Sequence, residues 1–318
     1  MKNSSFKITL TILGLCCLLG GVPLDSSGKD RIQIELYGGI SLLNPKDFNM
    51  LSKAEEEYNE LYFIQPQLYK QGYFVNVFPR IKSMIPAGVR LKYWMSQKLS
   101  FSLSAEVFNR KVTKKLEGTM SYVQSYWFDN QTKIYDPYRL GLSGIAVMGG
   151  LHYRIPVGNH TDVEFGASAG WAKANIDFSS TWAHSIHFWA EDYWEFISAD
   201  GGTLNGDGTG NGLITRLMIR INRSLGKRLG FFVEAAGTYC RMKSIEGSGS
   251  EIRLGIPGES NWEGRWGIKK EEIEFSSETK TIQFPTNYWG GWTGAQKERD
   301  FILDLSRVQL VIGFYIKL

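Results

Sequence analysis

Two histidines and two acidic residues stand close together in an aromatic stretch, TWAHSIHFWAEDYWEF. The spacing of His184, His187 and Glu191 would place all three on one face of a helix, and imidazole with carboxylate is a ligand set that zinc accepts. The many aromatic side chains fit a loop that packs on itself equally well. We therefore expect no metal, no cofactor and no catalytic residue, and keep His184 and His187 as the metal candidates.

Two further motifs match the sequence patterns of known sites but lack the structural setting or a residue that those sites need. GASAG, residues 166–170, matches the G-x-S-x-G of serine hydrolases, but there the serine lies in a sharp turn between a strand and a helix. Here the motif lies inside one alternating segment, so we expect Ser168 to be a small interior residue. NGDGTGNG, residues 205–212, resembles half of a calcium loop, but Arg216 stands where an EF-hand needs a glutamate. We expect a mobile turn there.

The elements that would position any such site are strands. Eight segments alternate between apolar and small or polar residues with a period of two, and each is long enough for a strand tilted across a bilayer, about 9–11 residues. LSFSLSAEVF shows the pattern, with Leu99, Phe101 and Leu103 on one face and serines between them. The segments begin near residues 31, 84, 99, 143, 161, 213, 229 and 306.

The connections between these segments alternate between short and long. SQK, PVGNH and SLGKR are tight, whereas the connections near 44–83, 111–138, 177–212 and 240–300 are long. Outer-membrane barrels have short periplasmic turns and long extracellular loops, and lipid forbids an open sheet edge. We therefore predict that residues 29–318 form an all-β, closed, antiparallel up-and-down transmembrane β-barrel of eight strands, with both termini periplasmic. The alternative is ten strands, but the hairpin IKKEEIEFSSETKTIQF is too charged to face lipid.

Alternation alone does not separate a membrane barrel from a soluble one, which hides its apolar face inside. The polar face favours the membrane, because it is made of small residues with few charges, as a narrow interior requires. Aromatic residues near the ends of the apolar rows fit a membrane-interface girdle: Tyr93, Tyr153, Trp171 and Tyr239. We therefore expect the aliphatic rows to face outward.

The first residues have the pattern of a secretory signal peptide. Lys2 and Lys7 precede an apolar run over residues 8–19, and we place the end of the signal near residue 28. Its removal would leave Cys240 as the single cysteine, so no intramolecular disulfide is expected. The net charge of +4 is spread thinly, which argues against a nucleic-acid partner.

Together the signal, the eight-strand meander and the alternation of VQLVIGFYIKL resemble the small OmpA/OmpX-type outer-membrane barrels. The resemblance covers the strands, roughly a third of the chain, and rests on pattern without an invariant motif. It implies assembly by the barrel-assembly machinery through the C-terminal strand. Members of the family usually end in an aromatic residue, whereas this chain ends in Leu318.

Two sets of residues are the candidate sites. Charged residues on the polar face must pair with one another in a narrow interior, and we expect them to fill it. They are Glu35, Arg90, Lys92, Glu106, Arg110, Glu164, Arg216, Arg220, Glu234 and Arg307. Tryptophans crowd the predicted loops and could form a binding surface or a core for the loops themselves. They are Trp127, Trp182, Trp189, Trp194, Trp262, Trp266, Trp289 and Trp292.

We predict a monomeric outer-membrane protein with a structural or surface-binding role and no enzyme activity. Its expected partners are outer-membrane lipid and lipopolysaccharide, and an extracellular ligand that the sequence does not identify. Two alternatives stay open. One is an integral outer-membrane enzyme, either a protease or a lipid A-modifying hydrolase or acyltransferase, that uses His184 or His187, and the other is a narrow solute pore.

The first long loop is expected to contain a helix. Leu51, Ala54 and Tyr58 fall at helical spacing, and residues 52–55 match a capping box.

Overall fold

The computed structural model describes residues 31–63, 69–73, 78–124, 127–190, 193–254, 258–275, 278–285 and 296–318. Within these ranges the chain is antiparallel β-sheet with a single α-helix. No helix in the described part combines the length and the apolar character needed to cross a membrane. The expected signal peptide, residues 1–28, lies outside the described residues.

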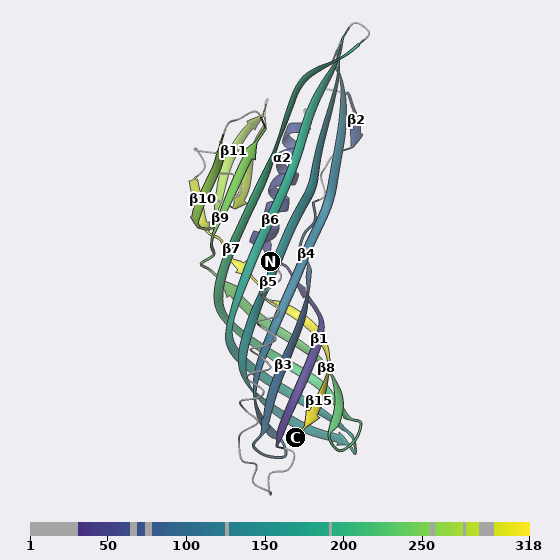
Figure 1. Cartoon of the computed structure of the whole chain (residues 1–318), viewed down its shortest axis with the longest axis vertical. Helices are drawn as coiled ribbons and strands as arrows, with labels where there is room; N and C mark the ends of the chain where they lie inside the picture. Colours follow the sequence, from purple (N-terminus) through teal and green to yellow (C-terminus); the bar gives the residue numbers. More distant parts are fainter. Residues whose placement is uncertain are drawn as a thin grey trace.

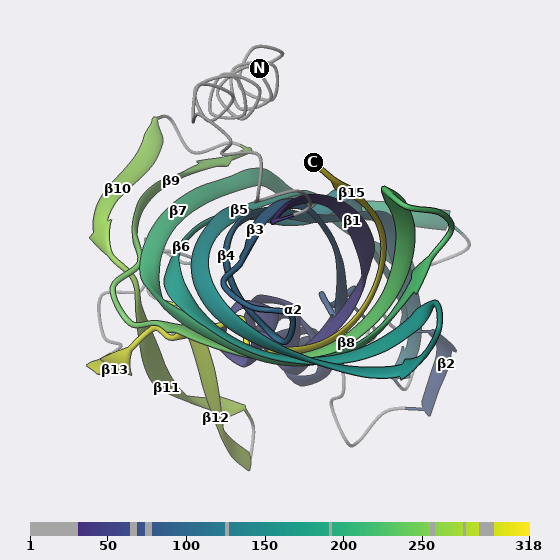
Figure 2. The same cartoon turned by 90° about the horizontal axis from the view of Figure 1, so that it is seen from below.

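Eight strands pair edge to edge in a closed ring, which Figure 2 shows end on. Each predicted segment falls within one of them, and the first strand pairs with the last from Gln33–Lys317 to Leu43–Arg307, as expected. In order around the ring they are β1 (Ile32–Leu43), β3 (Ser83–Trp94), β4 (Leu99–Gln124), β5 (Trp127–Gly158), β6 (Thr161–Ala190), β7 (Tyr193–Ser224), β8 (Leu229–Met242) and β15 (Arg307–Lys317).

The two faces of the ring differ as the alternation predicts. Aliphatic and aromatic side chains point outward and stay exposed; Leu217 is 70% exposed and Phe314 is 64% exposed. The intervening rows point inward, where the carboxylates of Glu35 and Glu164 are completely buried. The outward apolar belt ends at a level marked by Trp171 and the residues beside it, above which the outward side chains of β6 and β7 are polar.

Two of the predicted loops are strand instead. The regions 111–138 and 177–212 consist mostly of the continuations of β4, β5, β6 and β7, which rise beyond the ring as an extension (Figure 1). The NGDGTGNG segment is part of β7, so the prediction of a mobile turn is wrong. Its glycines face inward, where a Cβ on Gly206 would lie 2.1 Å from the ring of Phe178 and one on Gly210 would lie 2.1 Å from Ile245. Close packing, rather than turn formation, accounts for their small size.

The region 44–83 contains the predicted helix, α2 (Lys46–Phe63), and β2 (Tyr69–Tyr73), which pairs with β4. Phe48, Leu51 and Ala54 of α2 are buried, and the first two belong to the hydrophobic cluster on the inner face of the extension. The predicted capping box is wrong, because the helix begins six residues earlier than Ser52. The Ser52 hydroxyl instead donates to the Pro79 carbonyl at 2.6 Å.

The region 240–300 forms its own short strands beside the extension. β9 (Glu246–Arg253) pairs with β7 and with β10 (Glu259–Arg265). The predicted charged hairpin is present as β11 (Gly267–Phe275) and β12 (Glu278–Pro285), which form a separate sheet with β13 (Gln296–Asp300) outside the ring. A two-residue strand, β14 (Leu303–Asp304), then pairs with the end of β8 before the chain enters β15.

Candidate functional site

The interior of the ring holds a dense set of ion pairs. Arg220 on β7 donates two hydrogen bonds of 2.7 Å to the carboxylate of Glu35 on β1, and its Nη2 lies 3.1 Å from Glu164. Lys92 on β3 lies 2.6 Å from the same Glu164 carboxylate and 3.1 Å from Glu35. All four side chains are fully buried, so each charge is balanced by direct contacts rather than by water.

Two smaller groups complete this set. Arg90 reaches Glu234 at 2.9 Å and Glu35 at 3.1 Å. Farther along the interior, Glu106 accepts hydrogen bonds from two guanidinium groups, at 2.7 Å from Arg216 and at a short distance from Arg307. The Tyr37 hydroxyl donates to the same carboxylate at 3.4 Å.

Nine of the ten predicted interior charges therefore meet one another. They comprise five cations and four carboxylates, which leaves one surplus positive charge. Arg110, the tenth, lies half-buried on β4 and has no ion pair among the described residues. At the end where the short hairpins lie, Trp94 is nearly buried and Arg154 stacks 4.1 Å from its ring. The described ion pairs thus join buried side chains across the interior.

One cluster of three interior side chains, Ser102, His152 and Glu164, was not predicted. Ser102 Oγ lies 2.6 Å from His152 Nε2, and His152 Nδ1 lies 3.0 Å from Glu164 Oε1, which is the order of a nucleophile, a base and an acid. The backbone approaches it closely, since a Cβ on Gly166 would lie 2.5 Å from His152 Nδ1 and one on Gly150 would lie 3.3 Å from Ser102 Oγ. The inward phase of β5 could have identified His152. All three side chains are buried, so the arrangement is a buried polar network.

The serine of GASAG is also a packed interior residue. Ser168 lies within β6, which continues as a strand on both sides of it, so the turn that a nucleophile needs does not form. Its hydroxyl contacts Met148 Sδ at 4.0 Å.

His184 and His187 do not share a face. Both lie on β6, where residues three apart point to opposite sides, so the helical interpretation of their spacing is wrong. His184 is half-buried with Nε2 3.4 Å from Gln131 Oε1, and burial together with nearby Lys133 lowers its pKa. Glu191 lies outside the described residues, and no three His, Cys, Asp or Glu side chains gather as a metal site in the described part of the chain.

Two of the eight tryptophans have described side chains. Trp266 is fully buried, with ring centroids 5.9 Å from Phe178 and 5.2 Å from Phe301, so it belongs to a core and not to an exposed binding surface. Trp182 is half-buried, packs against the same core and lies 5.8 Å from Lys133 Nζ. The side chains of Trp127, Trp189, Trp194 and Trp262, and all of Trp289 and Trp292, lie outside what the structure describes.

Polar contacts attach α2 to the extension. The Tyr135 hydroxyl of β5 donates to Glu55 Oε2 at 2.7 Å, and burial raises the pKa of the Glu55 carboxyl. Burial likewise lowers the pKa of Lys133 on the same strand. At the start of the helix, the Asp47 carboxylate accepts two hydrogen bonds from Arg299, at 2.6 and 2.7 Å. The helix is therefore attached to β13 near its start and to the extension near its middle.

No protein-family profile matches the chain, and no curated protein matches it. It is similar to the outer membrane protein OprG from Pseudomonas aeruginosa, at 11% identity and a TM-score of 0.31, over 92% of this chain and 99% of that chain. A bacterial polysaccharide outer membrane secretin matches at 6% identity and a TM-score of 0.14, over 91% and 99%. Likenesses this remote carry no weight, and the fold rests on the strand pairings.

Proposed function

We propose that the chain is an integral outer-membrane β-barrel of the small OmpA/OmpX type. The observation that supports this most strongly is that apolar and charged side chains have exchanged the places they take in a soluble protein. Large apolar side chains are exposed over the whole ring, whereas charged ones fill its interior. Exposed apolar patches on soluble monomers rarely exceed a few hundred Å². A belt that surrounds a closed ring needs lipid around it, and the closed ring leaves no edge to be solvated.

The direction across the membrane follows from the connections. Tight turns join β3 to β4, β5 to β6 and β7 to β8 at one end, where β1 begins and β15 ends. By the usual asymmetry of such barrels, this end would be periplasmic and the extension extracellular. The C-terminal strand would then be presented to the barrel-assembly machinery.

The filled interior supports a structural or surface-binding role over a pore or an enzyme. The ion pairs connect strands that are not neighbours in the ring, and the side chains of Ser102, His152 and Glu164 are buried. The extension, with α2 and the sheet β11–β13, would be the part offered to an extracellular ligand, on a monomer held in lipid and lipopolysaccharide.

Two measurements on the full chain test this proposal. The unboiled protein in SDS is expected to migrate faster than the boiled protein, as closed barrels generally do. In planar bilayers the purified protein is expected to give no steady conductance. A single band position for both samples would contradict the barrel, and large, stable openings would contradict the filled interior.

A further inference from the structure

The end of the ring that carries the tight turns, the lower end in Figure 1, is basic. Outside the interior ion pairs, seven cationic side chains lie there: Arg31, Lys98, Arg154, Arg223, Lys227, Arg228 and Lys317. Asp162 on β6 is the one acidic side chain that the structure describes among them, and it lies 3.6 Å from Arg154. The other six cations make no ion pair with a described residue. This end therefore carries an excess of positive charge.

Five of these six cations are neighbours in the ring. They are Arg223, Lys227 and Arg228 of the hairpin between β7 and β8, Lys317 at the end of β15 and Arg31 before β1, and we call them the basic rim. The Lys317 amide donates to the Arg228 carbonyl at 2.8 Å, and the Leu318 amide donates to the Ile32 carbonyl at 2.9 Å. These bonds hold the hairpin, the end of β15 and the start of β1 side by side. Four of the five side chains are exposed, and that of Lys317 is half-buried.

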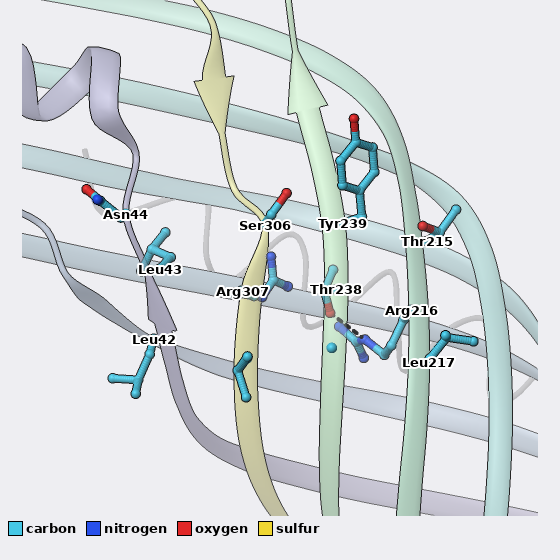
Figure 3. A pocket seen from close by; sticks show the side chains of 12 residues that line it. Leu42, Leu43, Asn44, Thr215, Arg216, Leu217, Thr238, Tyr239, Ser306 and Arg307 are labelled. Atoms are coloured by element: carbon cyan, nitrogen blue, oxygen red, sulfur yellow. Dashed lines mark hydrogen bonds between the residues drawn. The ribbon is translucent and has the colours of Figure 1, made fainter.

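The apolar belt begins directly beside the basic rim. Leu225, in the same hairpin, is 65% exposed, and Arg223 continues the exposed row of β7 that includes Ile221. From there the outward rows of β7, β8, β15 and β1 carry no charged side chain as far as Leu42 and Leu217, which line an open hollow at the far end of the belt (Figure 3). The basic rim is thus the charged end of an otherwise uncharged surface.

The other end of the belt carries charges of both signs. On β6 and β7 the outward rows leave the belt at Lys173, Asp177 and Asp207, which are all exposed. A surface of mixed sign gives an anion little net attraction, whereas a cluster of one sign attracts the opposite charge. An amphiphile whose head is anionic therefore fits the basic rim and the apolar rows next to it.

We propose that the basic rim binds the headgroup of an anionic phospholipid, in the leaflet on the side of the tight turns. The phosphate would accept hydrogen bonds from Arg223 and Arg228, and the acyl chains would lie along Leu225 and Leu229, which are both exposed. Guanidinium groups bind phosphate through charge-assisted hydrogen bonds. Each basic side chain near an anionic bilayer strengthens binding by roughly fivefold, so several together select an anionic over a zwitterionic lipid. The membrane as the source of the lipid rests on the proposed function.

The test uses the full chain purified in a neutral detergent and mixed with equal amounts of phosphatidylglycerol and phosphatidylcholine that carry the same acyl chains. Native mass spectrometry counts the molecules of each lipid that are bound. The natural protein is expected to prefer phosphatidylglycerol by about tenfold or more. The triple variant Arg223→Gln/Lys227→Gln/Arg228→Gln is expected to bind the two lipids equally, because it keeps the apolar rows and loses the charges of the hairpin.

A matched control loses three charges elsewhere. Lys111→Gln/Lys114→Gln/Lys115→Gln removes three exposed cations from β4, beyond the other end of the belt, and is expected to keep the preference for phosphatidylglycerol. The same loss of preference in both triple variants would overturn the proposal, because net charge alone would then decide which lipid binds.

Two further results would also overturn it. Equal binding of the two lipids by the natural protein would show partition onto the apolar belt without a headgroup site. Displacement of phosphatidylglycerol by an equal concentration of glycerol 3-phosphate would show a site for a free anion. Band migration of the same samples with and without boiling tests the barrel separately, so the two proposals can fail independently.

Discussion

Arg220 binds Glu35 through two parallel hydrogen bonds of 2.7 Å, and the two residues lie 185 positions apart in the chain. They come from β7 and β1, which are not neighbours in the ring, so the contact spans its interior. A bidentate pair of this kind has a fixed geometry. Since a shift of one residue would turn either side chain outward, the pair also specifies the register of both strands.

Removing the Glu35 charge should be costly. Glu35→Gln deprives Arg220, Lys92 and Arg90 of a shared carboxylate, and breaking a buried ion pair from one side costs about 3–5 kcal/mol. The midpoint of urea unfolding, followed by the folded band on unboiled gels, should fall accordingly. Asp304→Asn, which breaks the half-exposed pair with Arg241, is the control and should change stability by less than about 1 kcal/mol. Equal shifts for the two variants would contradict this interpretation of the interior.

The inward glycine of β6 at position 170 should not tolerate a side chain. A Cβ there would lie 1.9 Å from the Val147 carbonyl oxygen, which belongs to the backbone of β5 and moves only with the strand. Gly170→Ala should therefore lower stability by about 1–3 kcal/mol. Gly237→Ala, where a Cβ meets nothing within 4 Å, should leave the urea midpoint unchanged. Comparable midpoints for both variants would show that β5 and β6 are less tightly apposed.

The attachment of α2 should depend on pH through Glu55, which lies in the extension above the apolar belt. Burial raises the pKa of this carboxyl above its ordinary value of 4.5, so the folded state holds the proton more tightly than the unfolded state does. This stabilising contribution is complete below pH 4.5 and is lost as the pH rises through the raised pKa. After correction for the intrinsic pH dependence of exchange, the protection of the α2 amides should fall over that interval, and Glu55→Gln should flatten the profile. Protection in the natural protein that stays constant or grows as the pH rises would contradict the assignment.

Ser102 should be chemically inert despite its contact with His152. The two side chains are buried in the interior. A reagent that reacts with activated serines, such as a fluorophosphonate, should therefore not label the folded protein. Mass spectrometry of the treated protein checks this directly. A label that disappears in Ser102→Ala would show that the interior opens and would revive the enzyme alternative.

The sequence predicts the ring because strand alternation is a local property. The apolar belt and the inward rows that carry Glu35 and Arg220 follow from period two, and the pairing of β1 with β15 follows from the need to close an edge. The extension could not be predicted in this way. The glycines of NGDGTGNG resemble a turn in isolation, and their role depends on Phe178 and Ile245, which come from other parts of the chain.

The Ser102–His152–Glu164 network was missed for a similar reason. Its three members lie on three adjacent strands, so their contact depends on register between strands and not on spacing within one. Trp266 likewise stands in a region that is rich in polar residues, and only the contacts with Phe178 and Phe301 reveal that it is buried.

The most direct test of the proposed membrane location measures whether lipid or water surrounds the apolar belt. The protein carries Cys240→Ser and is reconstituted into lipid vesicles with one nitroxide label at a time. Labels at Leu310 and Leu151 face outward within the belt, and labels at Lys111 and Asn175 face outward above it. Collisions with oxygen should dominate at the first two positions, and collisions with a water-soluble nickel complex should dominate at the other two. Water accessibility at Leu310 and Leu151 equal to that at Lys111 and Asn175 would contradict the membrane barrel.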